Sequence, residues 1–239
     1  MIPSSVSQTG EEIDVALGFR ILRRTRSVDK TTVEAFKAVP VANVSDVMSR
    51  MTAGGPRLRP MHAGGVLAGP ALTVKTRPGD NLMIHKALMI AAPGDVIVVD
   101  AGGDLTNALF GEIMATEAET NGVAGLVING AIRDAGTIRN GRFPIFAAGV
   151  THRGPYKDGP GEINVPIALD GMVIEPGDLI LGDDDGVLCV PFAETAAILK
   201  EASKKHADEE RSIAAIRGGT RSKAWVDQTL ERLGCFIET

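Results

Sequence analysis

Aromatic residues and cysteines are scarce in this sequence of 239 residues. Seven Phe, one Tyr and one Trp leave little material for the base-stacking surfaces that bind single-stranded nucleic acid. The two cysteines, Cys189 and Cys235, are far apart and show neither a disulfide framework nor a metal-binding spacing. We therefore expect a cytoplasmic protein with reduced thiols, in which Cys189 is buried and unreactive.

Long apolar runs and an excess of positive charge are also missing. No stretch reaches the roughly 18 uninterrupted apolar residues that a membrane span requires. Residues 1–10 are polar, which is not typical of a secretory signal. The 25 basic and 30 acidic residues give a net charge of -5, which disfavours a polyanionic partner. The sequence thus predicts neither a nucleic-acid nor a membrane partner.

Glycine and proline are abundant instead, with 28 and 13 residues, which predicts many turns and short elements. The length suits one domain with one hydrophobic core. Three segments are expected: a helical lead-in over residues 1–28, a core over 29–191, and C-terminal helices over 192–239. The lead-in rests on weak amphipathic spacing over residues 13–22. Further helices are predicted at 29–39, 44–51, 81–92, 111–120, 192–217 and 222–233, and strands at 66–67, 71–76, 95–100, 123–129, 145–147, 163–168, 172–174, 179–182 and 187–190.

A strand, a helix and a second strand follow one another between residues 95 and 129. The two apolar runs suit buried parallel strands joined by a right-handed crossover. The short strands after residue 143 suggest a layered α/β sandwich with more than one sheet. Ligands bind outside the carboxyl ends of parallel strands, so we look for a site where the crossover helix begins and the second strand ends.

The start of the crossover helix offers backbone groups to a ligand. Gly111 lets a ligand approach the chain closely, and the amides of Glu112, Ile113 and Met114 in the first turn can hold a small carboxylate. The Glu112 side chain can position a water molecule or relay a proton. These four residues are candidates for substrate binding, and Glu112 is also a candidate catalytic residue.

Arg133 and Asp134 follow the second strand at the same edge. Arg133 can bind a carboxylate or an enolate oxygen through paired donors, and Asp134 can hold a divalent cation. The alternative is a helix cap with a surface ion pair, and spacing alone does not exclude it. Gly102 and Gly103 invite a nucleotide-binding interpretation, but no G-x-G-x-x-G motif and no P-loop lysine accompany them.

Several segments together resemble one family. The chain resembles the RraA-like family, which includes 4-hydroxy-4-methyl-2-oxoglutarate and 4-carboxy-4-hydroxy-2-oxoadipate aldolases, over roughly residues 30–215. An acidic residue 21 positions before an Arg-Asp pair is the family's active-site signature, and Glu112 and Arg133 have this spacing. Aldolases of the family most often carry Asp at the position of Glu112. The similar segments are 41–46, 78–85, 93–100, 111–114, 125–130, 133–134 and 182–191.

The resemblance implies a swivelling β/β/α sandwich and a class II pyruvate aldolase. Residues 111–114 and Arg133 would then bind a 2-keto acid, with Glu112 and Arg133 catalytic, and Asp134 would bind Mg²⁺ or Mn²⁺. The metal would act as a Lewis acid in retro-aldol cleavage or in oxaloacetate decarboxylation. A homotrimer or homohexamer is implied, with the C-terminal helices at subunit interfaces, where Glu209 or Glu210 is a candidate to complete a neighbouring site.

One alternative function remains open, and a second is set aside. The family also contains non-catalytic regulators that bind a ribonuclease, but these are shorter and lack the C-terminal helices predicted here. A methyltransferase label has also been attached to relatives, and the glycine loop that it requires is missing from the sequence. Three residue-level alternatives rank lower. His85 can line the cavity, although the sequence favours a packing residue there. Lys75 or Lys86 can act as a Schiff-base nucleophile, and residues 183–186 resemble a calcium loop fragment, although a tight turn is favoured.

Overall fold

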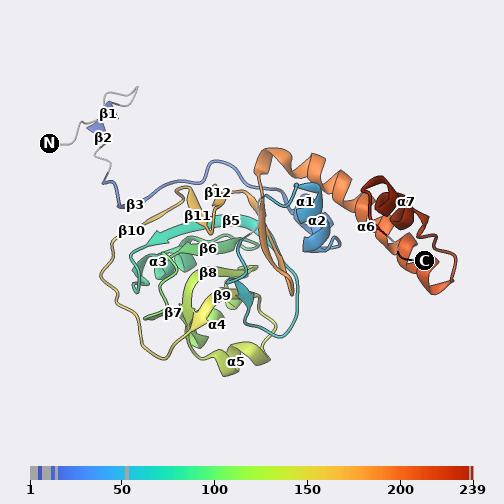
Figure 1. Cartoon of the computed structure of the whole chain (residues 1–239). Helices are drawn as coiled ribbons and strands as arrows, with labels where there is room; N and C mark the ends of the chain where they lie inside the picture. Colours follow the sequence, from blue (N-terminus) through green and yellow to red (C-terminus); the bar gives the residue numbers. More distant parts are fainter. Residues whose placement is uncertain (1–4, 7–11, 14–15, 52–53, 237, 239) are drawn as a thin grey trace.

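Strands and helices alternate through the middle of the chain in a computed structural model that describes residues 5–6, 12–13, 16–51, 54–236 and 238 (Figure 1). The helices are α1 (Lys30–Phe36), α2 (Val41–Val47), α3 (Leu82–Ile90), α4 (Glu112–Thr120), α5 (Ala135–Asn140), the 3-10 helix η1 (Phe192–Glu194), α6 (Thr195–Arg217) and α7 (Ala224–Arg232). The strands are β1 (Ser5–Val6), β2 (Glu12–Ile13), β3 (Phe19–Ile21), β4 (Arg59–Pro60), β5 (Leu67–Thr76), β6 (Val96–Asp100), β7 (Ala108–Phe110), β8 (Gly125–Ile132), β9 (Ile145–Val150), β10 (Gly161–Ile163), β11 (Ile167–Leu169), β12 (Met172–Ile174), β13 (Leu179–Asp183) and β14 (Gly186–Val190).

One large mixed sheet runs through the molecule in the order β14-β13-β5-β6-β8-β9-β4. Strands β5, β6, β8 and β9 are mutually parallel, so the predicted parallel strand–helix–strand unit is confirmed in β6, α4 and β8. The short β7, which the sequence did not reveal, also pairs in parallel with β8. Strand β5 is continuous although it contains Pro70, where the sequence predicts a break.

Three layers form around this sheet because alternate residues of each strand point to opposite faces. Ile97 and Val99 of β6 pack with residues of α3, α4 and α5. Val96 and Val98 pack on the other side, with the β11–β12 hairpin and with β13 and β14. Helices α1, α2 and the start of α6 cover β13 and β14. The predicted layered α/β architecture is therefore confirmed.

The sequence predicts a helical lead-in over residues 1–28. This prediction is wrong for the residues of the lead-in that the structure describes. Phe19–Ile21 form β3, which pairs in parallel with β10, and Arg20 forms an ion pair with Glu162. Phe19 and Ile21 are exposed, so the apolar spacing does not bury a face here, and pairing with the neighbouring strand decides the conformation. The rest of the predicted stretch at residues 14–15 lies outside the described residues.

Helix α2 begins three residues earlier than predicted. Asp183 Oδ2 accepts a hydrogen bond from the Val41 amide at 3.0 Å, so the turn between β13 and β14 caps the helix from outside. Pro40 supplies the N-cap position, and Asn43, which directly precedes the predicted helix, is buried and donates to Glu209. The residues around Asp183 form a tight turn, as the sequence favours over a calcium loop.

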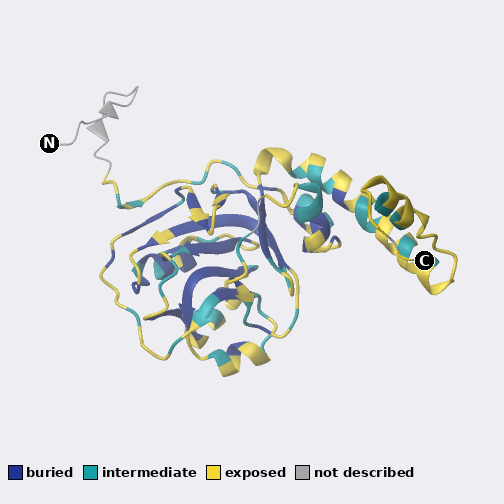
Figure 2. Cartoon of the chain, viewed as in Figure 1, coloured by how far each residue is buried: buried dark blue, intermediate teal, exposed yellow. Residues whose placement is uncertain are grey.

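The C-terminal helices form an arm that projects from the body of the molecule (Figure 1). Ala202 is the buried residue of α6, and Figure 2 shows both α6 and α7 largely exposed. The Asn43 amide donates to Glu209, and Lys205 forms ion pairs with Asp46 and Glu209, which fastens α6 to α2. None of the described helices is both long and apolar enough to cross a membrane.

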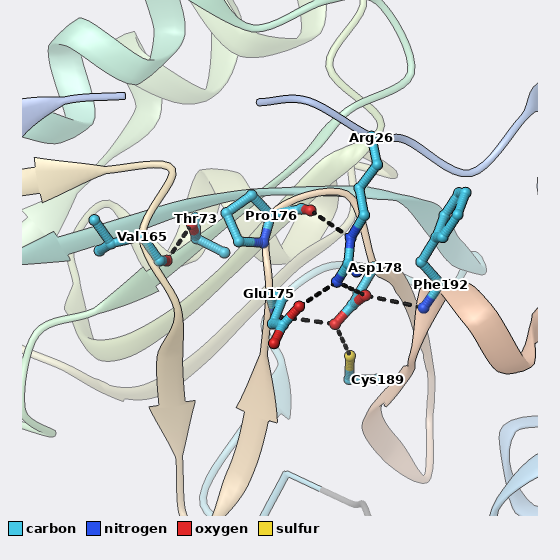
Figure 3. A network of polar contacts seen from close by, with 8 residues as sticks. All are labelled: Arg26, Thr73, Val165, Glu175, Pro176, Asp178, Cys189 and Phe192. Carbon is cyan, nitrogen blue, oxygen red and sulfur yellow. Dashed lines mark hydrogen bonds and ion pairs between the residues drawn. The ribbon is translucent and has the colours of Figure 1, made fainter. Parts of the chain in front are cut away.

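Asp178 anchors the base of this arm (Figure 3). Its buried carboxylate accepts hydrogen bonds from the amides of Glu175 and Phe192 and from the Arg26 guanidinium. The Cys189 thiol donates to the same carboxylate at 3.8 Å, and burial, with Asp178 beside it, raises the pKa of Cys189 above its usual range. Cys189 is thus a buried protonated thiol, as predicted.

Candidate active site

The carboxyl ends of the parallel strands bring the predicted site residues together. Strand β8 ends at Ile132, and the next amide, that of Arg133, donates to the Phe110 carbonyl at 2.9 Å. Phe110 ends β7, and Gly111 and α4 follow it directly. This hydrogen bond places Arg133 and Asp134 beside the first turn of α4, as the topology of the sheet predicts.

Asp134 is the N-cap residue of α5 and has a left-handed backbone, with φ 56°, and its side chain reaches the first turn of α4. Its Oδ2 accepts a hydrogen bond from the Glu112 amide at 3.0 Å and lies 3.8 Å from Arg133 Nε. The carboxylate stays 40% exposed, so it remains open to a further ligand.

The other amides of this turn are unused. Within the described residues, the amides of Ile113 and Met114 donate to no protein acceptor. Free amides at a helix N-terminus bind anions. The Glu112 amide, by contrast, is already taken by Asp134. Of the three amides that the sequence predicts to bind a carboxylate, this turn therefore leaves two free.

A cavity of about 330 Å³ opens beside this turn. It lies between the start of α3, the start of α4 and the loop that follows β9, and one wall is apolar. It is lined by Asn81, His85, Ala108, Leu109, Phe110, Gly111, Ile113, Met114, Arg133, Asp134, Gly154, Pro155 and Lys157.

Polar and charged side chains also line the cavity. Asn81 is 3% exposed and donates to the Leu109 carbonyl at 3.0 Å, while its Oδ1 has no partner among the described residues. His85 follows one turn later on α3 and lines the cavity, so the packing role that the sequence favours for it is wrong. Burial lowers the pKa of His85, and the positive charge of Lys157 lowers it further, so the imidazole is neutral at pH 7. The cavity thus carries cations at two places, Arg133 and Lys157, with a neutral imidazole near Lys157.

Five of the six predicted site residues line the cavity, and Glu112 does not. Its side chain is exposed, so the role predicted for its carboxylate stays a prediction. Sequence reasoning missed Asn81 and Lys157. Asn81 carries a signal, since it caps a predicted helix in a segment shared with a known family. Lys157 lies in a loop with no periodicity, and nothing local indicates that this loop reaches α3.

Comparisons with known proteins show the family of this chain. The RraA-like family, described as Aldolase/RraA, matches residues 41–189. The chain belongs to the RraA-like family. A relative from Halalkalibacterium halodurans, named "Putative 4-hydroxy-4-methyl-2-oxoglutarate aldolase", is 42% identical over 77% of this chain and 88% of its own length.

Solved structures show the same RraA-like fold. A protein from Pseudomonas syringae pv. tomato superposes with a TM-score of 0.73 at 27% identity, over 82% of this chain and 96% of its own. The RNA-processing inhibitor RraA from Thermus thermophilis has a TM-score of 0.59 at 32% identity and covers 64% of this chain and 92% of its own. About a third of this RraA-like chain therefore lies outside that match. The fold predicted from the resemblance is confirmed.

The donor set near the cavity of this RraA-like protein bears on a metal. No group of three or more His, Cys, Asp or Glu side chains suited to a metal occurs in the described part of the chain. Asp134 is the carboxylate at the cavity wall, and its Oδ1 accepts no hydrogen bond from a described residue. Mg²⁺ is commonly bound by one or two carboxylates, with water and substrate oxygens completing six ligands. The site fits a water-rich Mg²⁺ or Mn²⁺, and it does not fit a cage made of protein ligands.

The other candidates in this RraA-like chain lie elsewhere. Neither Lys75 nor Lys86 lines the cavity, so neither is placed to form a Schiff base there. Glu209 accepts from Asn43 and pairs with Lys205, and these contacts lower its pKa. It is therefore an ionised carboxylate held on the arm, and its predicted part in a neighbouring site stays a prediction, as does that of Glu210.

Proposed function

We propose that this RraA-like protein is a divalent-metal-dependent pyruvate aldolase. Its substrates would be 2-keto acids of the 4-hydroxy-4-methyl-2-oxoglutarate type, which carry a second carboxylate. The relative's name supports the aldolase chemistry. The observation that carries the proposal is that one cavity is lined by the first turn of α4, which has free amides, and by two cationic side chains, Arg133 and Lys157.

The pyruvyl end of the substrate would lie against α4. The amides of Ile113 and Met114 bind the C1 carboxylate, and Arg133 donates to the C2 oxygen, where negative charge develops. Lys157 binds the second carboxylate. The apolar side of the cavity then surrounds the carbon chain and excludes water from the reacting bond.

Cleavage breaks the bond between C3 and C4. The C4 hydroxyl loses its proton, the C4 oxygen forms a carbonyl, and the electron pair of the broken bond passes into the enolate of pyruvate. A proton then adds to C3, so 4-hydroxy-4-methyl-2-oxoglutarate yields two molecules of pyruvate. His85 lines the cavity, and its neutral imidazole would accept the hydroxyl proton. Glu112, whose side chain is exposed at the start of α4, is the alternative base.

A divalent metal at Asp134 would supply Lewis-acid stabilisation of the enolate oxygen. Asp134 is suited to hold it because its carboxylate is oriented by the Glu112 amide and remains partly exposed. Loss of CO2 from oxaloacetate gives the same pyruvate enolate. We therefore include oxaloacetate decarboxylation in the proposal.

Pyruvate release tests the proposal directly. Purified protein should release pyruvate from 4-hydroxy-4-methyl-2-oxoglutarate, lose this activity in EDTA and regain it with Mg²⁺ or Mn²⁺. Arg133→Lys should lower kcat/KM about 100-fold, because lysine lacks the paired donors. Arg139→Lys makes the same change on the exposed side of α5 and should have no effect. Turnover that persists in EDTA would disprove the metal dependence.

A ribonuclease-binding regulator is the second candidate, because RraA from Thermus thermophilis is named an RNA-processing inhibitor. Retention of a purified ribonuclease by this protein, undiminished in Arg133→Ala and without pyruvate release, would favour it. We also propose a homotrimer or homohexamer with the α6–α7 arm between subunits. Light scattering of the purified chain measures the assembly, and a monomer would disprove it.

A further inference from the structure

A second buried carboxylate, Asp80, lies just outside the cavity. Asp80 is 0% exposed, in the turn between β5 and α3. Its Oδ1 accepts from the Leu82 amide at 2.9 Å. Its Oδ2 accepts from the amides of Asp158 and Gly159 at 2.7 and 2.9 Å, and from Arg77 Nη2 at 3.1 Å. One carboxylate thus joins the start of α3 to a loop that is distant in sequence.

The same loop is tied to the same turn on the other side of Lys157. The Tyr156 amide donates to the Gly79 carbonyl at 2.8 Å, and the Asn81 amide donates to the Tyr156 carbonyl at 3.0 Å. The Arg77 guanidinium also lies over the Tyr156 ring, 5.9 Å from its centroid. The backbone is therefore fixed at both neighbours of Lys157.

These contacts matter because they fix the part of the loop around Lys157. The start of the loop is held separately, where the Arg153 carbonyl accepts from the Ala108 amide and the Gly154 carbonyl accepts from the Asn107 side chain. Residues 152–154 and 156–158 are exposed and belong to no helix or regular strand. An exposed loop of this kind normally samples many conformations. Here, the turn that fixes the loop also starts α3, which carries Asn81 and His85 into the cavity. Two walls of the cavity therefore share one buried support.

We propose that Asp80 is a positioning residue that holds Lys157 in place to bind the second carboxylate of the substrate. This inference rests on the proposed aldolase function. A fixed ammonium group loses little freedom when substrate binds, so the support should lower KM for substrates that carry the second carboxylate. Pyruvate has a single carboxylate, which α4 and Arg133 bind, so its binding should depend little on Asp80.

Asp80→Asn is the discriminating variant. The amide group keeps the shape but turns one acceptor into a donor, which must then face either the Leu82 amide or the donors at Oδ2. KM for 4-hydroxy-4-methyl-2-oxoglutarate should rise about tenfold, the effect of losing a charge-assisted contact. The rate at which the enzyme exchanges the methyl protons of pyruvate with D2O should change less than about twofold, since that reaction does not use Lys157.

Asp178→Asn is the matched control. Asp178 is also a buried carboxylate that accepts from two backbone amides and an arginine, but it lies at the base of the arm. Both variants should unfold at lower temperature, and only Asp80→Asn should raise KM. Hydrogen exchange should accelerate at the Asp158 and Gly159 amides in Asp80→Asn alone. Equal KM values in the two variants would overturn the proposal.

A double-mutant cycle separates positioning from general loosening. If Asp80 acts through Lys157, KM in Asp80→Asn with Lys157→Met should equal KM in Lys157→Met alone. If the increases in KM from the two single substitutions instead multiply in the double variant, the proposal is contradicted. Should Asp80→Asn fail to fold, Arg77→Met removes the partly exposed donor to Asp80 and the contact with the Tyr156 ring. It leaves the three backbone donors in place and should raise KM in the same direction by a smaller factor. If the wild-type chain neither cleaves the substrate nor exchanges the methyl protons of pyruvate, the proposed aldolase function is wrong. Hydrogen exchange at the Asp158 and Gly159 amides would still show whether Asp80 holds the loop.

Discussion

Gly111 and Asp134 approach each other so closely that a Cβ at residue 111 would lie 2.5 Å from Asp134 Oδ2. Gly111 has an extended backbone, with φ -158°, which any residue adopts. Glycine is therefore needed at this position for space. The absence of a side chain at Gly111 also makes room for Arg133, whose Cγ would lie 3.0 Å from a Cβ at residue 111.

Gly111→Ala should consequently damage the site more than the fold. The new methyl group must displace Asp134 from the Glu112 amide and shift Arg133. A displacement of about 1 Å in a catalytic group costs on the order of 100-fold in rate, so we expect a loss of that size in kcat/KM. Steady-state kinetics of pyruvate release measures it.

Gly136→Ala is the control for this prediction. An added Cβ at residue 136 meets nothing within 4 Å, and α5 gains a better helix former by about 1 kcal/mol. Activity should stay at the wild-type level and thermal stability should not fall. An equal loss of activity in both variants would show that α5 as a whole, and not the space at Gly111, governs the site.

The charges around His85 predict its titration. Burial and Lys157 lower the pKa of His85 below its usual 6.5, and Glu117 opposes them. Lys157→Met should raise the pKa, but not fully, because burial remains; Glu117→Gln should lower it further. NMR titration of the imidazole, assigned with His85→Asn, measures these shifts. pKa shifts of His85 in the opposite directions would show that other charges control its titration.

The same titration sets the pH dependence of the proposed reaction. A base must be deprotonated, so activity that depends on neutral His85 should be constant around pH 7 and fall only below pH 6.5. Lys157→Met should move this acid limb toward higher pH. An unmoved acid limb would favour Glu112 as the base.

Asp178 should contribute to stability without contributing to the site. Asp178→Ala leaves the amides of Glu175 and Phe192 and the Arg26 guanidinium without their acceptor (Figure 3). We expect unfolding to be easier by about 3 kcal/mol, as when one partner of a buried charged network is removed. Urea unfolding measures it. Cys189→Ser, which keeps a donor to Asp178, should cost less.

Local pattern was sufficient for much of this fold. The apolar runs at β6 and β8 and the spacing of α4 are properties of contiguous residues, so the sequence predicts them. The position of the site follows as well, because a parallel strand–helix–strand unit places Arg133 and Asp134 beside the start of α4. The family resemblance added a chemistry to those positions.

Contacts between distant segments settled the rest. β3 is a strand because β10 lies beside it, and α2 starts at Val41 because Asp183 caps it from another turn. Lys157 faces the cavity because Asp80 holds its loop. A sequence determines which residues can donate, accept or pack, and these are short-range properties. Which donor meets which acceptor across 78 residues, as between Asp80 and Asp158, is decided only when the chain is folded.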